Sequence, residues 1–309
     1  MRTRSLATTA ALATLTLTMA ACGSTSLSGG SGGSGGAGGG ATPAGGSQAP
    51  VQVDQALVAK LPEKIKTSKK IVVGTDATYA PNEFLDADGK TVVGADIDVL
   101  NTVAARFGVT VEYQPAGFDT IITGVQGKKY DLGISSFTIT DKRLEQVNMV
   151  SYFNAGTQWA TAQGNPKQVD PENACGKTVA VQTGTTQDED DLPKRQEKCG
   201  ANKINVLQFD GQDQATAAVV SGRADAMLAD SPVVAYAAKQ SQGKLAPLGE
   251  IYDAAPYGIV VPKDQTEFAN AIAEALTKAK ADGSYERALQ KWGTEKGAIS
   301  TFQVNPAAS

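Results

Sequence analysis

The sequence contains no histidine, and its 309 residues include only three cysteines, with no pair at CxxC spacing. Histidine is the side chain most often used as a general base near neutral pH, and it is a main zinc ligand. Its absence excludes His-dependent catalytic triads, imidazole general bases and zinc sites built on histidine. A large share of enzyme mechanisms is therefore closed to this chain.

The chain also lacks an excess of positive charge and a complete phosphate-binding motif. It has 28 Lys and Arg against 32 Asp and Glu, a formal charge of −4, which argues against nucleic acid and polybasic membrane contact as partners. Gly176-Lys177-Thr178 has the tail of a nucleotide-binding loop, but Pro171 stands where its first glycine belongs. We therefore expect no cofactor and no metal, and we assign any coupled ATP hydrolysis to another subunit.

The N-terminal apolar run is too short to span a bilayer. Residues 6–19 are interrupted by threonine, follow two arginines and lead to small residues before Cys22. This pattern predicts a signal peptide over residues 1–21, and hence export. The small residues before Cys22 resemble a bacterial lipoprotein box, in which the cysteine is acylated and anchors the protein to the outer face of the cell membrane. The alternative is an ordinary signal peptide cleaved near a chance cysteine.

After Cys22, residues 23–50 consist mainly of Gly, Ser, Ala and Pro with no apolar period, so we expect residues 22–50 to be the lipidated cysteine and a flexible tether with a reach on the order of 30 Å. The remaining cysteines, Cys175 and Cys199, form an even pair in polar, turn-like surroundings. In an exported protein this favours a disulfide over two buried thiols. Closing that loop should stabilise the fold by roughly 3 kcal/mol in the chain-entropy treatment.

The most informative internal stretch is Tyr130 to Arg143, which reads YDLGISSFTITDKR. It predicts a short buried strand at 132–134, a hydroxyl-rich turn, and a helix capped by Thr140. Open α/β sheets bind ligands at the carboxyl ends of their strands, and a guanidinium there suits a carboxylate. Taken alone, the turn could be ordinary turn chemistry and Arg143 a solvated charge.

Strands and helices alternate along the chain, which predicts the α/β class with a wound, mostly parallel sheet. Residues 222–230 echo residues 127–136: in both, an Asp precedes a short apolar strand, and polar side chains follow it. The echo implies two similar lobes. Asp96 is expected to cap a helix, Asp88-Gly89 to form a hairpin turn, and residues 300–309 to form a loose tail.

From about residue 70 to 297 the chain resembles the family 3 bacterial extracellular solute-binding proteins, the receptors of polar amino acid ABC importers. The resemblance implies a type II periplasmic-binding-protein-like fold, in which two lobes joined by two hinge strands close on a ligand. Lobe I would comprise residues 69–157 and 257–299, and lobe II residues 158–256. The segments that carry the resemblance are GTDATYAP (74–81), GADIDV (94–99), 130–143, VAVQTGT (179–185) and 222–230.

The resemblance also implies roles for single residues. Arg143 would bind the α-carboxylate of an amino acid, and Asp230 would accept hydrogen bonds from its α-ammonium. A zwitterion that leaves water needs a partner for each of its two charges. The alternative for Asp230 is capping of the helix that begins at Ser231-Pro232. The full set of predicted ligand-binding residues is Asp76, Tyr79, Phe118, Ser135, Ser136, Thr138, Arg143, Gln182, Thr185, Thr186 and Asp230.

Side-chain specificity is predicted from charge. Asp76 supplies a negative charge and Gln182 is neutral, which disfavours an acidic ligand through like-charge repulsion. We therefore hypothesise a cationic or polar neutral amino acid, such as arginine, lysine, ornithine or glutamine. Ala95 and Asn82 depart from the bulkier residue and the Phe that the family usually has there, so these departures bear on specificity more than on the fold.

The function implied is capture and delivery of an amino acid to permease subunits with a separate ATPase, by a monomer without catalysis. One alternative is a tethered amino-acid sensor for a signalling partner with the same cleft. Another is a dehydratase on the same fold, in which Asp76 or Asp230 would have to donate a proton. Neighbouring genes for a permease and an ATPase would separate the importer from the sensor.

Overall fold

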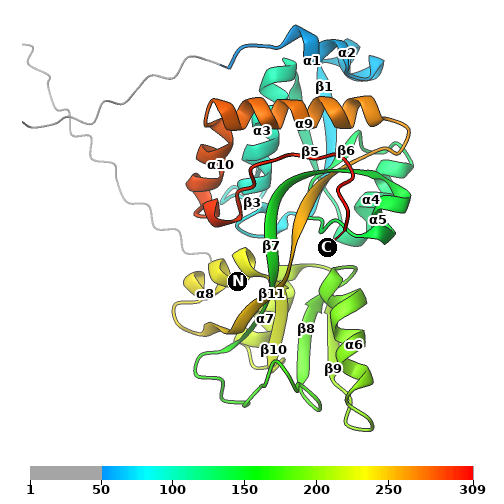
Figure 1. The fold of residues 1–309 in the computed structure, drawn as a ribbon. Helices are drawn as coiled ribbons and strands as arrows, with labels where there is room; N and C mark the ends of the chain where they lie inside the picture. The colour runs from blue at the N-terminus through cyan, green and yellow to red at the C-terminus, as the bar shows by residue number, and fades with distance from the viewer. Residues whose placement is uncertain (1–50, 309) are drawn as a thin grey trace, which may run out of the picture. The chain divides into compact units, whose positions relative to one another are not determined.

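The structure is a computed structural model that describes residues 51–308 (Figure 1). The predicted signal peptide, Cys22 and the predicted tether therefore lie outside the described residues. Within residues 51–308, no helix has both the length and the apolar character needed to cross a membrane.

An eight-stranded sheet runs through the described residues in the order β5-β1-β6-β11-β7-β10-β8-β9. At one end β1 pairs in parallel with β5 and β6, and at the other end β8 pairs in parallel with β9 and β10. The alternating strands and helices thus form an α/β sheet, as predicted. These strands are β1 (Lys70–Thr75), β5 (Thr110–Pro115), β6 (Leu132–Gly133), β8 (Thr178–Gln182), β9 (Asn205–Phe209) and β10 (Ala226–Asp230).

Two long antiparallel strands, β7 (Asn148–Ala162) and β11 (Leu245–Val261), cross the middle of the sheet (Figure 1). They join the part built around β1, β5 and β6, here called lobe I, to the part built around β8, β9 and β10, here called lobe II. Their pairing register shifts at three places between Leu248 and Gly258. The predicted lobe limits fall inside these two strands and stay a prediction.

Helices cover both sides of the lobe I strands. One core packs under α3, α9 and α10, and the alternating residues Ile71 and Val73 of β1 face it. A second core, with Ile121 and Val125, packs under α4 on the other side. The helices are α3 (Ala95–Phe107), α4 (Phe118–Gln126), α5 (Asp141–Gln146), α9 (Thr266–Ala281), α10 (Ser284–Trp292) and the 3-10 turn η2 (Glu295–Gly297).

The start of α3 differs from the prediction. The helix begins at Ala95 after Gly94, whose φ of 141° favours glycine, and Asp96 does not cap it. Asp96 is instead buried at 3% exposure. The predicted hairpin does form: β3 (Glu83–Leu85) pairs with β2 (Thr78–Tyr79) and β4 (Val92–Val93). Asp88 fixes its turn by accepting the N–H groups of Lys90 and Thr91.

Lobe II also has a core on each side of its strands. One packs under α7 (Gln212–Val220) and α8 (Ser231–Gln240). The other packs under α6 (Leu192–Glu197), which continues a π-helical turn η1 (Gln187–Asp191).

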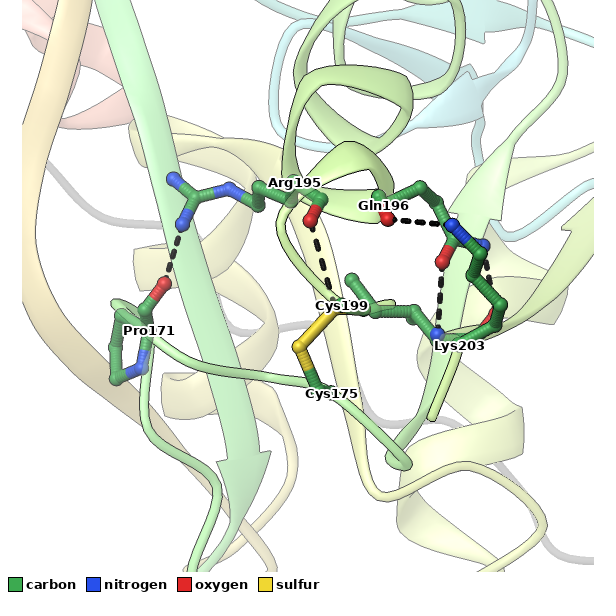
Figure 2. Close-up of a disulfide and its surroundings, with 7 residues drawn as sticks. Pro171, Cys175, Arg195, Gln196, Cys199 and Lys203 are labelled. Carbon is green, nitrogen blue, oxygen red and sulfur yellow. Dashed lines mark hydrogen bonds between the residues drawn. A yellow bond between two sulfur atoms is a disulfide. The ribbon is translucent and has the colours of Figure 1, made fainter. Parts of the chain in front are cut away.

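The predicted disulfide is present in lobe II. Cys175, before β8, is bonded to Cys199, after α6 (Figure 2). The Gln196 side chain accepts from the Ile204 N–H and donates to its carbonyl, both at 2.8 Å. These links hold the outer end of α6 against the sheet.

Both ends of the described chain pack on lobe I. Two helices that the sequence did not predict, α1 (Gln55–Ala59) and α2 (Glu63–Ser68), bury Leu57, Leu61 and Ile65 in its core. The prediction of a loose tail is wrong, because Phe302 is 8% exposed and Val304 forms a β-bridge with Val150. Burial of these few apolar side chains is enough to order short polar segments.

Candidate functional site

A narrow cavity lies between the two lobes, where the strands of each lobe end. It contains eight of the eleven residues predicted to bind a ligand; Asp76, Ser135 and Gln182 are not among its lining residues. The lining residues are Tyr79, Phe118, Ser136, Thr138 and Arg143 from lobe I, and Thr185, Thr186, Gln187 and Asp230 from lobe II.

Arg143 is placed by the first turn of α5. Thr140 caps this helix as predicted, with its hydroxyl accepting the Arg143 N–H at 3.3 Å. The guanidinium donates to the Thr138 carbonyl at 2.8 Å and, across the cavity, to the Gly184 carbonyl at 3.0 Å. Its position is therefore fixed by neutral carbonyl groups contributed by both lobes.

Two aromatic rings support the same guanidinium. Phe118 and Phe137 stack with their centroids 4.6 Å apart, and the guanidinium carbon of Arg143 lies 5.4 and 5.5 Å from them. Cation–π contacts of this kind stabilise a charge only modestly. Burial lowers the pKa of Arg143 from its ordinary value, so an anion brought to this place would be bound favourably.

Three residues that line the cavity have backbone N–H groups without a hydrogen-bond partner in the described chain. Thr138 lines it, and its N–H makes no hydrogen bond within residues 51–308. On the lobe II side, the N–H groups of Thr185 and Thr186 at the start of η1 likewise make no backbone hydrogen bond in the described chain. Unpaired N–H groups at the start of a helix are suited to an anionic ligand.

Asp230 is the last residue of β10 and is 6% exposed. It occupies the position before α8, but its side chain makes no capping bond there, so the capping alternative is wrong. Instead the carboxylate accepts hydrogen bonds from Tyr79 Oη at 2.9 Å, Tyr257 Oη at 2.7 Å and Gln187 Nε2 at 2.8 Å. The strand end and three distant side chains hold it towards the cavity.

Neither charge at the cavity is paired within the described residues. No ion pair of residues 51–308 includes Arg143 or Asp230. Burial raises the pKa of Asp230, and the three hydrogen bonds it accepts act in the opposite direction. A guanidinium without a carboxylate and a buried carboxylate without a cation thus line one cavity, an arrangement that suits a zwitterion.

Asp76 and Gln182 meet beside the cavity and link the lobes. The Gln182 amide donates to the Asp76 carboxylate and to the Asp210 carbonyl. Burial raises the pKa of Asp76 to about 6. The Ser135 hydroxyl accepts the Asp76 N–H at 2.9 Å and donates to Glu83 at 3.1 Å, so Ser135 faces the protein interior.

A second cavity adjoins the first and shares Phe118, Arg143, Thr185 and Thr186 with it. Its wall is rich in carboxylates, and Lys142 pairs with Glu189 across the two lobes. The acidic residues of this wall are Asp119, Glu189 and Asp190.

Sequence reasoning missed Gln187, Tyr257 and Phe137. Gln187 follows the hydroxyl-rich turn that the prediction singled out, so its place at a helix start was a usable signal. Tyr257 was assigned only to a strand, and its contact with Asp230 spans 27 positions of the chain. Phe137 lies inside the predicted carboxylate-binding stretch, but its stacking on Phe118 depends on the tertiary fold.

Comparison with known proteins supplies the context for this geometry. The family "Bacterial extracellular solute-binding proteins, family 3" matches residues 71–295. The arginine-binding protein ArgT of Corynebacterium glutamicum is 36% identical over 259 residues, 83% of this chain and 84% of that protein.

Solved structures agree with the sequence relatives. An ancestral arginine-binding protein bound to arginine is similar with a TM-score of 0.68 and 36% identity, over 72% of this chain and 98% of that one. An ancestral amino acid-binding protein, described as a precursor of cyclohexadienyl dehydratase, is similar with a TM-score of 0.66 and 33% identity, over 74% and 98%. The relatives are thus amino-acid-binding proteins, and the described fold is that of periplasmic amino-acid-binding proteins.

Proposed function

Because the chain belongs to the family 3 bacterial extracellular solute-binding proteins, we propose that it captures a cationic or polar neutral amino acid between its lobes and delivers it to an ABC importer. The observation that carries the proposal is that two oppositely charged side chains without ion-pair partners in the described chain line the same cavity. Arg143 would bind the α-carboxylate, and Asp230 would bind the α-ammonium. Contacts from both lobes would make binding and lobe closure one equilibrium.

The side chain of the ligand is proposed to be cationic in the first instance. Asp119 and Asp190 line the adjoining cavity together with the Glu189–Lys142 ion pair, and Asp76 is bonded to Gln182 beside the site. Carboxylates at these places attract a guanidinium or ammonium and repel a ligand carboxylate. The names of the similar proteins support arginine as the first ligand to test.

Isothermal titration of the purified chain without its leader tests this proposal. Arginine, lysine, ornithine, glutamine and glutamate would be compared under one buffer condition. We expect heat of binding for at least one cationic or amide amino acid and none for glutamate. Binding of glutamate alone, or of none of the five, would contradict the proposal.

Two further parts of the proposal concern the setting of the protein. We propose that Cys22 carries the lipid anchor and that the partner is a permease with a separate ATPase.

Replacing Cys22 with Ser should release the protein from cell membranes into the medium, as seen by fractionation. Deleting the gene should abolish uptake of the labelled ligand; uptake that continues unchanged while a signalling response is lost would favour the sensor alternative.

A further inference from the structure

Two buried acids lie next to the Ser135–Ser136 turn without lining the cavity. Glu83, the first residue of β3, is 0% exposed, and Asp96, in the first turn of α3, is 3% exposed. Neither forms an ion pair within residues 51–308. Buried carboxyl groups without cations are costly unless they are protonated or richly hydrogen-bonded.

The hydrogen bonds of these acids go to the two serines. Asp96 accepts the Ser136 N–H at 2.9 Å and the Tyr152 hydroxyl. Glu83 accepts the Ser135 hydroxyl at 3.1 Å, and its other oxygen lies 3.3 Å from the Ser136 hydroxyl. The acids thus fix the backbone of one serine and contact the side chains of both.

The two carboxyl groups are neighbours, because Glu83 Oε2 and Asp96 Oδ2 each lie 3.3 Å from the same Ser136 hydroxyl. Two negative charges this close, without a cation, cannot both persist in a buried place, so one of the two carboxyl groups must hold a proton. Asp96 receives a backbone N–H and a phenol, so the negative charge belongs on Asp96 and the proton on Glu83. Burial, followed by the charge of Asp96, raises the pKa of Glu83 well above its ordinary value.

We propose that Glu83 and Asp96 form a carboxylic acid–carboxylate pair that holds the Ser135–Ser136 turn in its ligand-binding conformation. Glu83 and Asp96 are then positioning residues, which act on the ligand only through Ser136. This inference rests on the proposed function, because it deepens the account of the same cavity.

The conformation of Ser136 explains why such a device is needed. Its φ is 52°, in the left-handed region that a serine adopts at a cost. The Asp96 carboxylate holds its N–H, and Asn82 donates to its hydroxyl at 2.9 Å. Because Ser136 lines the cavity with Arg143 and Thr138, a relaxed turn would displace the wall that meets the α-carboxylate.

The surroundings of the pair offer other acids and phenols. Asp76 adds to the effects that raise the pKa of Glu83, and Tyr152 donates to Asp96. Loss of the shared proton would therefore leave two adjacent charges without a counterion. The titratable groups that face the pair are Asp76 after β1, Tyr79 of β2, Tyr113 of β5, Tyr152 of β7 and Tyr285 of α10.

The protonation state of Glu83 can be measured in the ligand-free protein. Carbon-13 labelling of glutamate side-chain carboxyl groups, with the Glu83 signal assigned by its loss in Glu83→Gln, gives the titration of this group by NMR. We expect the pKa of Glu83 to lie well above its ordinary value. Titration near the ordinary value of about 4.3 would overturn the shared proton.

The effect on the ligand is measured by titration with arginine, or with whichever amino acid of the panel binds. Glu83→Gln retains a donor towards Asp96 and an acceptor for Ser135, so its dissociation constant should stay within about threefold of the parent. Glu83→Ala removes both contacts and should weaken binding about 10- to 100-fold, by analogy with the loss of residues that orient ligand-contacting groups. Asp98→Asn, on the same helix but bonded to Trp292, is the matched control and should leave binding unchanged.

A pH series tests the inference even if Glu83→Ala fails to fold. The ratio of the dissociation constants of the parent and Glu83→Gln cancels the titration of the ligand. Since Glu83 binds its proton below its raised pKa and loses it above, the ratio should be near one below that pKa and rise above it. A ratio that does not change with pH, or full affinity in Glu83→Ala, would overturn the inference. If the parent binds no amino acid of the panel, the proposed function is overturned instead. The NMR titration then still shows whether Glu83 holds a proton.

Discussion

The two charged ends of the cavity are assembled in different ways. The arginine end, made of Arg143, Thr138 and Phe137 with Phe118, comes mostly from one stretch of fourteen residues, and its guanidinium is partly buried and bonded to carbonyl groups. The aspartate end joins Asp230 to Tyr79, Gln187 and Tyr257, which lie far apart in the chain. A local motif can therefore supply the cation, whereas the anion depends on both lobes being folded and in contact.

The largest effect is expected at the aspartate end. Asp230→Asn removes a buried charge and leaves the ligand ammonium without a counterion, so binding should weaken by about 4 kcal/mol, roughly a thousandfold. The ligand-free variant should be more stable than the parent, because an unpaired buried carboxylate is removed. Titration calorimetry and urea unfolding measure the two effects. Unchanged affinity would remove Asp230 from the site.

A slightly smaller effect is expected at the arginine end. Arg143→Ala should weaken binding by about 3 kcal/mol, roughly a hundredfold, because the partly exposed guanidinium is better screened than Asp230. Lys142→Ala removes the neighbouring charge that pairs with Glu189 and is the matched control, with an expected change below about 1 kcal/mol. A larger loss of affinity in Lys142→Ala than in Arg143→Ala would contradict the assignment of Arg143 to the ligand carboxylate.

Asp76 offers a third charge with which to sharpen the comparison, because burial raises its pKa to about 6. The folded state holds this proton to higher pH than the unfolded state, where the pKa is about 3.9. Its contribution to stability is therefore full below about pH 4 and is lost as the pH rises through 6, a decrease of about 3 kcal/mol. Urea unfolding at pH 4 to 8 should show this slope in the parent and a shallower one in Asp76→Asn. Equal slopes would mean that Asp76 titrates normally.

The smallest effect concerns the aromatic support of Arg143. Phe118→Leu keeps an apolar wall but removes the stacked ring above the guanidinium. Binding should weaken by about 1 kcal/mol, roughly fivefold, as calorimetry would show. A loss as large as that of Arg143→Ala would show that the ring positions the guanidinium rather than merely stabilising its charge.

The contrast between the two ends also explains what the sequence revealed. The strand, turn, Thr140 cap and Arg143 follow one another in the chain, so turn chemistry and capping preferences predicted these elements locally, and the family resemblance then assigned Arg143 its role. Asp230 was predicted through the family resemblance, but a helix cap remained an open alternative until its three hydrogen bonds were seen. Tyr257 carries no local signal of such a contact, and Gln187 carries only its place at the start of a helix.

The errors in the fold have related physical causes. Aspartate is a residue type that often caps helices, but the Asp96 side chain is buried beside Glu83 and accepts the Ser136 N–H instead. The short helices α1 and α2 and the tail around Phe302 have weak periodicity, and they are ordered by contacts with a core formed elsewhere in the chain. Local propensity could not foresee these tertiary contacts.

The docking of α1 and α2 has a mechanical consequence. If residues 22–50 moor the protein to a membrane, any pull enters the fold through helices that are packed on lobe I, where Leu57 and Ile65 are buried and Asp54 is paired with Lys278. In Figure 1, α1 and α2 lie on lobe I, so such a pull would not enter the fold through lobe II. If the protein is anchored in this way, a form released from the membrane should bind its ligand as tightly as the anchored form.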